Sequence, residues 1–189
     1  MPRGCRLSGK TLHRWDKPQL TDWETLVREC TPMAFQTAWR ILGHLQDTED
    51  AVQEALVQAF RAHRRGEIRN WGGFVRTAIT SRALDRLRQR RTADALPENL
   101  ASPGNESPDR MAEMNELAQW LRSAVARLPA RQAEVFSLHY FGELSHAEIA
   151  AELKITSEAV AMALHKARAS IAAKQSQSTS TNSIRSADR

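Results

Sequence analysis

Apolar residues recur at helical spacing in several long stretches of the chain. The first stretch, DTEDAVQEALVQAFRA at 47–62, predicts an amphipathic helix. Asp47 is its expected N-cap, and Glu49 and Asp50 in the first turn would meet the positive end of the helix dipole. The apolar face is predicted to consist of Ala51, Val52, Ala55, Leu56, Ala59 and Phe60. The opposite face is acidic and rich in amides, and by composition alone it is an ordinary solvated surface.

The second stretch, NWGGFVRTAITSRALDRLRQRR at 70–91, predicts a helix with a cationic face. Its buried stripe is predicted to consist of Trp71, Phe74, Val75, Ala78, Ile79, Ala83 and Leu87. Outside this stripe lie Arg76, Arg82, Arg86, Arg88, Arg90 and Arg91. The same helix offers little acid besides Asp85, and clustered arginines repel one another unless an anion joins them. This face is therefore a candidate nucleic-acid contact, with a solvated charged surface as the alternative.

The third stretch, at 128–171, has the pattern of a helix-turn-helix. Ser145 and Glu148 are expected to form a capping box for its first helix, and Thr156 is the expected N-cap of the second, after a turn at Lys154 and Ile155. The second helix is predicted to bury Val160, Ala163, Leu164, Ala167 and Ile171. Its exposed face is predicted to carry Ser157, Glu158, Ala161, Met162, His165, Lys166 and Ala169. The alternative is a plain αα-hairpin within a helical bundle.

Shifts in composition divide the chain, which is predicted to be all-α, into two small helical domains joined by a flexible linker. No alternating run of β-branched residues competes with the helical pattern. Residues 1–18 and 174–189 are polar and are expected to be disordered tails. The expected linker, 93–112, is rich in Pro, Gly, Ser and acids. The domains are therefore expected at 19–92 and 113–173, and the second contains the helix-turn-helix.

Charge and reactive side chains narrow the classes of function. The chain has 189 residues and a net charge of +5, which suits a polyanionic partner. Cys5 and Cys30 form no CxxC motif and the histidines are scattered, so we expect no disulfide, metal or other cofactor. No converging nucleophile, base or metal ligand indicates an enzyme. No apolar run could span a bilayer or act as a secretory signal, so we expect a cytoplasmic protein without membrane insertion.

With these motifs the chain resembles bacterial RNA polymerase sigma factors of the extracytoplasmic-function group, within the sigma-70 family. The resemblance covers about 20–173. DTEDAVQEALVQAFRA is similar to the acidic helix of the family's region 2, which docks on core RNA polymerase, and ALDRLRQRR is similar to the end of its promoter-melting helix. The stretch 128–168 is similar to region 4. Larger members of the family carry a further domain between these two, for which the expected linker is too short.

The resemblance implies a non-catalytic factor for transcription initiation, with core RNA polymerase and promoter DNA as partners; an anti-sigma factor is a further candidate partner. It implies that polymerase is bound by Asp50, Gln53 and Glu54. In the first domain, the residues implied to contact the minus-ten promoter element are Arg76, Thr80, Ser81, Arg82 and Arg86. In the helix-turn-helix, those implied to contact the minus-thirty-five element are Ser157, Ala161, Met162, His165, Lys166 and Arg168.

The chain departs from the family's pattern at two DNA-contacting places. An Asn that lies near the flipped base of the minus-ten element is matched here by Thr80 or Ser81. Where the reading helix of the family often has Lys or Arg followed by Ser, this chain has Ala161 and Met162, so His165, Lys166 and Arg168 become the stronger candidates, with contacts mostly to phosphate.

A free-standing helix-turn-helix regulator is the alternative function. It would explain the second domain but not the acidic helix, and it should dimerise to lengthen its reading site. Co-purification with polymerase would separate the two functions.

Overall fold

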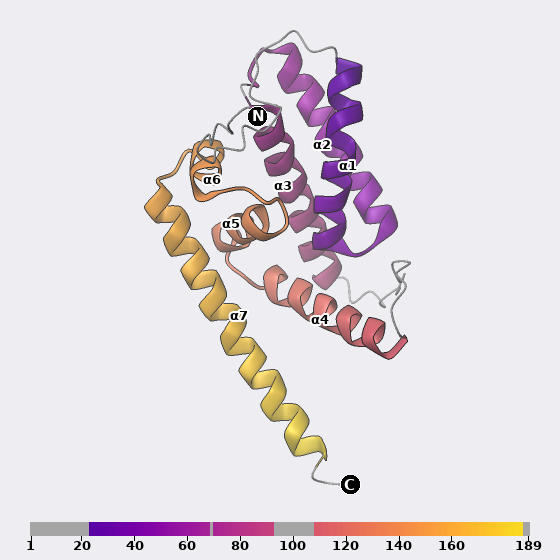
Figure 1. Ribbon diagram of the computed structural model, residues 1–189, viewed down its shortest axis with the longest axis vertical. Coiled ribbons are helices and arrows are strands. Elements are labelled where there is room, and N and C mark those ends of the chain that lie inside the picture. Colours follow the sequence, from indigo (N-terminus) through magenta and orange to yellow (C-terminus); the bar gives the residue numbers. More distant parts are fainter. Residues whose placement is uncertain (1–22, 69, 93–107, 187–189) are drawn as a thin grey trace, which may run out of the picture.

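Helices alone form the regular structure of residues 23–68, 70–92 and 108–186, which are the residues described by the computed structural model (Figure 1). In chain order they are α1 (Trp23–Leu42), α2 (Leu45–Arg64), α3 (Trp71–Thr92), α4 (Pro108–Ala126), α5 (Ala130–Tyr140), α6 (His146–Leu153) and α7 (Ser157–Ser186). The prediction of an all-α fold is confirmed. The expected tail at 1–18 and most of the expected linker lie outside the described residues.

Small side chains build most of the core between the first three helices. On α1, Ala34, Ala38 and Ile41 follow one another at helical spacing and are fully buried. They join one apolar cluster with residues of α2 and α3, among them Ala51, Ala55, Ala59, Val75 and Ile79. Because the distance between packed helices depends on the side chains at their contact, alanines allow a close approach. The packing of α1 and α2 against α3 therefore determines which side of α3 faces each of them.

α6 and α7 form the predicted helix-turn-helix. The Ser145 hydroxyl accepts the backbone N–H of Glu148, and the Glu148 carboxylate accepts the backbone N–H of Ser145 at 2.8 Å, which completes the capping box. Lys154 ends α6 in the left-handed conformation with φ of 53°, and the Thr156 hydroxyl then accepts the N–H of Ala159 at 3.2 Å. Both predicted caps are confirmed, and they fix the direction in which α7 leaves the turn.

The predicted faces of α7 are also confirmed. Its inner stripe is buried at Val160, Ala163, Leu164 and Ala167, and Ile171 is partly buried. All seven residues predicted to face outward are exposed, and Met162 keeps 55% of its surface. The inner stripe packs mainly against α5 and α6, together with the fully buried Ile149. Helical periodicity alone was sufficient here because α5 and α6, the main neighbours of α7, lie on the same side of it.

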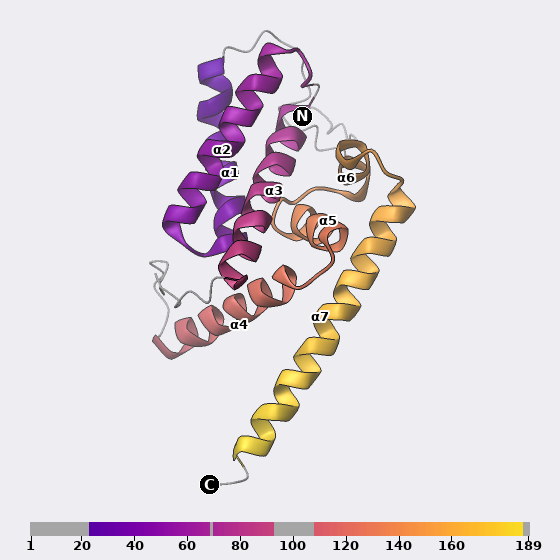
Figure 2. The same ribbon diagram turned by 180° about the vertical axis from the view of Figure 1, so that it is seen from behind.

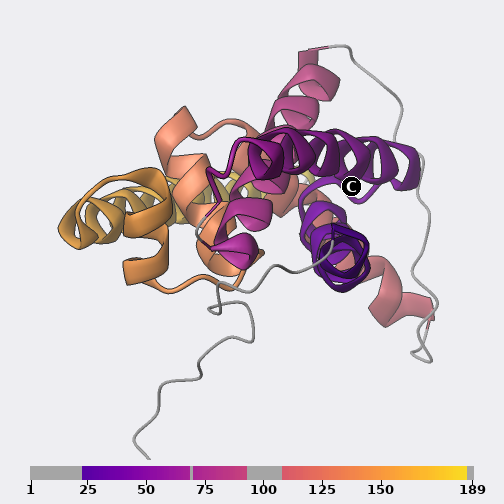
Figure 3. The same ribbon diagram turned by 90° about the horizontal axis from the view of Figure 1, so that it is seen from above.

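The two halves of the chain pack against each other through one shared apolar cluster. Leu84 of α3 and Ile41 of α1 belong to the same cluster as Leu128, Ala133 and Phe136 of the second half. Both side views place α5 and α6 next to α3, on the side away from α2, and α4 under the end of α3 (Figures 1 and 2). In the view from above, α1 and α2 lie on one side of α3, and α6 and α7 lie on the other (Figure 3).

Polar contacts join the halves at the end of α1. Arg40 donates to the carbonyl oxygen of Phe141 at 3.2 Å and forms an ion pair with Glu143 at 2.6 Å. This hydrogen bond and the charge of Arg40 lower the pKa of the Glu143 carboxyl. Arg122 of α4 donates to the carbonyl oxygen of Arg40 at 3.4 Å and lies against Gly43, whose φ of 62° ends α1. A cation is favourable at this negative end of a helix.

Several predicted boundaries are wrong. α2 begins at Leu45 with His44 as its N-cap, so Asp47 lies in the first turn instead of capping it. Gly43 turns the chain so sharply that the two residues before Asp47 already belong to the helix. α4 begins at Pro108, inside the expected linker, and α7 continues to Ser186 because no Gly or Pro interrupts 174–186. Within the described residues, no helix is long and apolar enough to cross a membrane.

Loss of the α6 capping box should lower the stability of the helix-turn-helix. We expect Ser145→Ala to reduce the free energy of unfolding by about 1 kcal/mol. The reason is that the Ser145 hydroxyl, which accepts the backbone N–H of Glu148 and donates to the Glu148 carboxylate, is lost from the start of α6. Urea unfolding followed by circular dichroism measures this change. Ser123→Ala, at an exposed position inside α4, is the matched control and should leave stability equal or slightly higher. Equal stabilities of Ser145→Ala and the parent would contradict the role of this cap.

Candidate functional site

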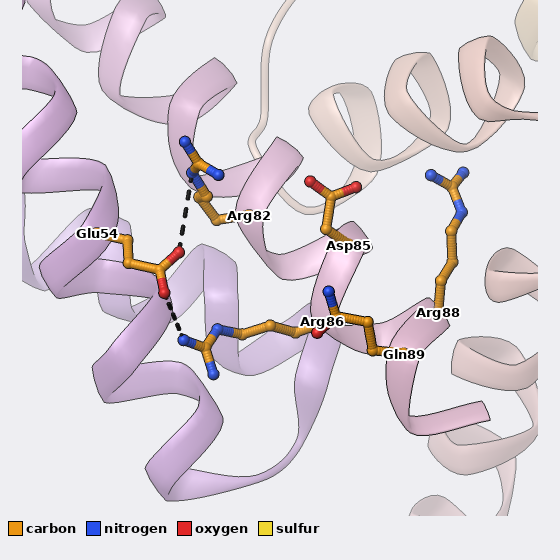
Figure 4. Close-up of a pocket in the computed structure, with 6 residues that line it drawn as sticks. All are labelled: Glu54, Arg82, Asp85, Arg86, Arg88 and Gln89. Carbon is orange, nitrogen blue, oxygen red and sulfur yellow. Dashed lines mark hydrogen bonds and ion pairs between the residues drawn. The ribbon is translucent and has the colours of Figure 1, made fainter. Parts of the chain in front are cut away.

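A seam of opposite charges runs between α2 and α3. Arg86 of α3 lies 2.7 Å from Glu54 and 3.2 Å from Asp50, both on α2. Arg90 reaches Asp47 at 3.1 Å, one turn further along, and Arg82 lies 3.9 Å from Glu54. The close-up shows Glu54 between the guanidinium groups of Arg82 and Arg86 (Figure 4). The acids of α2 are three and four residues apart and the arginines of α3 are four residues apart, so each row lies along one face of its helix and the two rows pair.

This seam corrects the expectation that the arginines of α3 lack acidic neighbours. The prediction counted only the acids of the same helix, whereas the anions that join these arginines come from α2. Asp47 and Arg90, which the sequence analysis did not select as site residues, complete the seam. The signal that could have found them is the matched spacing of 47, 50 and 54 with 82, 86 and 90. Whether charged side chains on two helices pair depends on how the helices are oriented relative to each other. Sequence periodicity does not give that orientation.

The carboxylates of the seam remain reachable from solvent. The side chains of Asp50 and Glu54 keep 47% and 48% of their surface, while Arg86 keeps 23%. Gln53 is exposed beside them. The three residues implied to bind polymerase therefore lie together on the outer face of α2. The groove next to this face is lined by Glu54, Arg82, Asp85, Arg86, Arg88 and Gln89.

The predicted DNA-contacting residues of α3 do not share one surface. Arg82 and Arg86 lie on the seam, and Ser81 is exposed. Arg76 is half-buried and its charge contributes to the lowered pKa of Glu143. Thr80 is fully buried, and its hydroxyl has no hydrogen-bond partner among the described residues. Thr80 is thus inaccessible to DNA in this arrangement.

The predicted DNA-contacting residues of α7 lie on its exposed face. Ser157, Ala161, Met162, His165 and Lys166 are all open to solvent. Arg168 is exposed as well, but its guanidinium donates to the Tyr140 hydroxyl at 2.7 Å and lies 5.6 Å from the centre of the Tyr140 ring. This contact holds Arg168 against the end of α5. The face offers one free lysine, one histidine and an apolar centre, which is a weak set of groups for reading bases directly.

No group of three or more His, Cys, Asp or Glu side chains that could hold a metal ion occurs in the described ranges. Cys30 is buried, and burial raises the pKa of its thiol to about 11. A thiol of this kind is a poor nucleophile at neutral pH. The exposed functional groups are acids on α2 and basic or neutral groups on α3 and α7.

Comparison with known protein families assigns both halves of the chain. Residues 26–93 match the family model of sigma-70 region 2, and residues 118–171 match that of sigma-70 region 4. The chain therefore belongs to the sigma-70 family of RNA polymerase sigma factors. Within that family, the chain is similar to members of the extracytoplasmic-function group.

Three relatives illustrate this similarity. The chain is 27% identical over 157 residues to the ECF RNA polymerase sigma factor SigE of Mycolicibacterium smegmatis, across 81% of the chain and 61% of the relative. It is 28% identical over 160 residues to RpoE of Cereibacter sphaeroides, across 72% of the chain and 86% of the relative. It is 26% identical over 148 residues to SigW of Bacillus subtilis, across 71% of the chain and 78% of the relative. The region 2 match argues against a free-standing regulator, which would need only the helix-turn-helix.

Removal of Arg86 should weaken the packing of α3 on α2. We expect Arg86→Gln to lower the free energy of unfolding by about 0.5–1 kcal/mol at low salt, because Asp50 and Glu54 lose their shared cation. The loss should shrink at high salt, where exposed charges are screened. Urea unfolding at the two salt concentrations measures it, with Arg61→Gln, an exposed arginine of α2 outside the seam, as the matched control. A loss that does not depend on salt would mean that Arg86 acts by packing alone.

Proposed function

We propose that this protein is a sigma factor that binds core RNA polymerase through α2 and directs it to promoters through α3 and the helix-turn-helix. The observation that carries the proposal is the presence, in one chain, of a sigma-70 region 2 and a region 4, with the carboxylates of the region 2 helix α2 exposed. Its role is one of binding and positioning in the cytoplasm, where polymerase and promoter DNA are found. Sigma factors as a family bind both of these partners.

The polymerase contact is assigned to the exposed acids and amide of α2. Asp50, Gln53 and Glu54 lie within little more than one helical turn and are supported from behind by the arginines of α3. A partner with basic side chains can take over part of the ion pairs that Arg82 and Arg86 now provide. Because ion pairs at half-exposed positions contribute little net stability, this exchange costs little. The charges also favour rapid association with a basic surface.

The DNA contacts are divided between α3 and α7, each of which binds DNA weakly. Arg82 and Arg86 of α3 supply positive charge for phosphates near the minus-ten element, while the exposed face of α7 lies toward the minus-thirty-five element. On α7, Lys166 and His165 can reach phosphates or base edges, and Met162 can contact only apolar groups such as thymine methyls. Polymerase bound to α2 provides the remaining affinity for the promoter, so neither α3 nor α7 needs to bind the promoter tightly by itself.

Reversal of a charge on the outer face of α2 should weaken polymerase binding. We expect Glu54→Arg to weaken capture of core polymerase at least about tenfold, because an arginine would then face a basic partner surface. Pull-down with purified core enzyme measures this, and circular dichroism checks the fold. Glu49→Arg is the matched control: it makes the same exchange on an exposed position of α2 that points to a different side of the helix. Undiminished capture by folded Glu54→Arg would refute this assignment.

On the helix-turn-helix, Lys166 should matter more than Met162. We expect Lys166→Ala to lower transcription from a promoter that requires its upstream element, and to reduce the salt slope of promoter binding by about one. Met162→Ala loses only a van der Waals contact, so its transcription should stay closer to that of the parent. In vitro transcription and filter binding at several salt concentrations measure both effects. The assignment of the reading face is wrong if both variants transcribe as well as the parent.

A further inference from the structure

Tyr140, the last residue of α5, makes a polar contact with α7. Its hydroxyl accepts the Nε–H of Arg168 at 2.7 Å, and the guanidinium carbon of Arg168 lies 5.6 Å from the centre of the tyrosine ring. Both residues lie at the surface, and Tyr140 is 42% exposed. A ligand can therefore reach both side chains at once. We name these two residues the tyrosine–arginine pair.

The packing of α5 against α7 fixes the place of this pair (Figures 1 and 2). Leu138, two residues before Tyr140, and Leu164, four residues before Arg168, belong to one buried apolar cluster. The centre of the Tyr140 ring also lies 4.6 Å from that of Phe136, which is buried one turn earlier on α5. Side chains in a packed core occupy well-defined positions. Tyr140 thus presents its hydroxyl to Arg168 from a fixed support.

The partner of Arg168 is neutral, unlike the partners of the arginines on α3. Arg82, Arg86 and Arg90 each pair with a carboxylate of α2. In the part of the chain that the structure describes, Arg168 forms no ion pair, and the Tyr140 hydroxyl is its one hydrogen-bond partner. A hydroxyl orients the guanidinium without cancelling its charge. Arg168 therefore keeps its full attraction for an anion.

Both members of the pair keep hydrogen-bond donors for such an anion. The contact with Tyr140 uses only the Nε–H of Arg168, so the N–H groups of Nη1 and Nη2 remain available. A hydroxyl that accepts one hydrogen bond still has its own proton to donate. Among the described residues, nothing accepts that proton of Tyr140. The guanidinium fork suits the oxygens of a phosphate, and the tyrosine O–H adds a further donor beside it.

The position of Arg168 on α7 indicates which phosphate it meets. Arg168 follows Ala161 by seven residues, which is about two turns or ~10 Å along the same side of the helix. In a helix-turn-helix, residues near the start of the second helix lie closest to the base edges. A residue two turns further on lies nearer the edge of the groove, where the DNA backbone runs. A backbone phosphate is therefore the anion within its reach.

We propose that Tyr140 and Arg168 together bind one backbone phosphate beside the minus-thirty-five element. Tyr140 has two roles in this site: it holds the guanidinium of Arg168 in place, and it donates its own O–H to the same phosphate. The inference rests on the proposed function, which places the exposed face of α7 against the upstream element. It adds a residue of α5 to the DNA-binding surface. The contact orients the helix-turn-helix on the duplex and carries no base preference.

Removal of the hydroxyl tests the role of Tyr140. Tyr140→Phe keeps the ring against Phe136, and we expect it to weaken promoter binding by the full chain with core polymerase about threefold. Its salt slope should stay that of the parent because no charge is lost. Arg168→Gln should weaken binding about tenfold and reduce the slope by about one. Filter binding at several salt concentrations measures both, and circular dichroism checks the fold.

The double variant separates positioning from a general effect on the fold. Because Tyr140 acts through Arg168, adding Tyr140→Phe to Arg168→Gln should change the affinity by less than about twofold. An equal loss from Tyr140→Phe in the parent and in Arg168→Gln would overturn the proposal, since the hydroxyl would then act without the arginine. Promoter binding by Tyr140→Phe that equals that of the parent would overturn it as well.

A scan of the DNA backbone locates the phosphate. Single phosphates around the upstream element are replaced in turn by uncharged methylphosphonate. We expect one position at which the replacement weakens binding by the parent but not by Arg168→Gln. Lys166→Ala is the matched control, since it also removes one cation from α7 and should keep the sensitivity at that position. A scan that gives the parent and Arg168→Gln the same profile would refute the site.

Binding of the full chain alone to a duplex of unrelated sequence separates this inference from the proposed function. At low salt, fluorescence anisotropy should rank the parent above Tyr140→Phe and Tyr140→Phe above Arg168→Gln, because a phosphate contact does not depend on sequence. If the parent with polymerase transcribes no promoter, the proposed function fails while this ranking still decides whether the pair binds phosphate. Equal affinities of the three proteins would overturn the inference. So would selective displacement of the duplex by inorganic phosphate over chloride at equal ionic strength, because the site would then take free phosphate.

Discussion

The orientation of α3 among the helices that pack against it is the constraint on which the other features of this protein depend. On one side Arg86 reaches between Asp50 and Glu54 of α2, and on the other Glu152 lies against Gly73. The apolar cluster that α3 shares with α1 and α2 favours this orientation, because turning the helix would bring its arginines into the core. The arginines accordingly lie against the acids of α2.

The charged seam connects the two binding roles proposed for the first domain. The same carboxylates that would meet polymerase now neutralise arginines that would meet DNA. Surface pairs of this kind are weak individually, so they orient side chains more than they stabilise the fold. A partner that binds the acids of α2 also changes the charge balance around Arg82 and Arg86. In the proposed function, the polymerase contact and the DNA contact therefore involve side chains of α2 and α3 that touch each other.

The two elements proposed to contact DNA differ in accessibility. On α7, Met162 and Lys166 are exposed, whereas Thr80 of α3 is fully buried. Among the described residues, the Thr80 hydroxyl also lacks a hydrogen-bond partner. Of the two elements, the exposed face of α7 is therefore the one that a partner can reach in this arrangement.

The sequence by itself determined the features that depend on near neighbours along the chain. Periodicity identified the faces of α7, and the residues Ser145, Glu148 and Thr156 identified the caps, because these bonds span three residues. The start of α2 was placed wrongly because the turn at Gly43 is shorter than the acids suggested. Only the tertiary structure decided that α2 provides the anions for α3 and that Thr80 is buried. Both facts depend on how helices distant in sequence rotate against one another, and that rotation is selected by the packing of their small side chains.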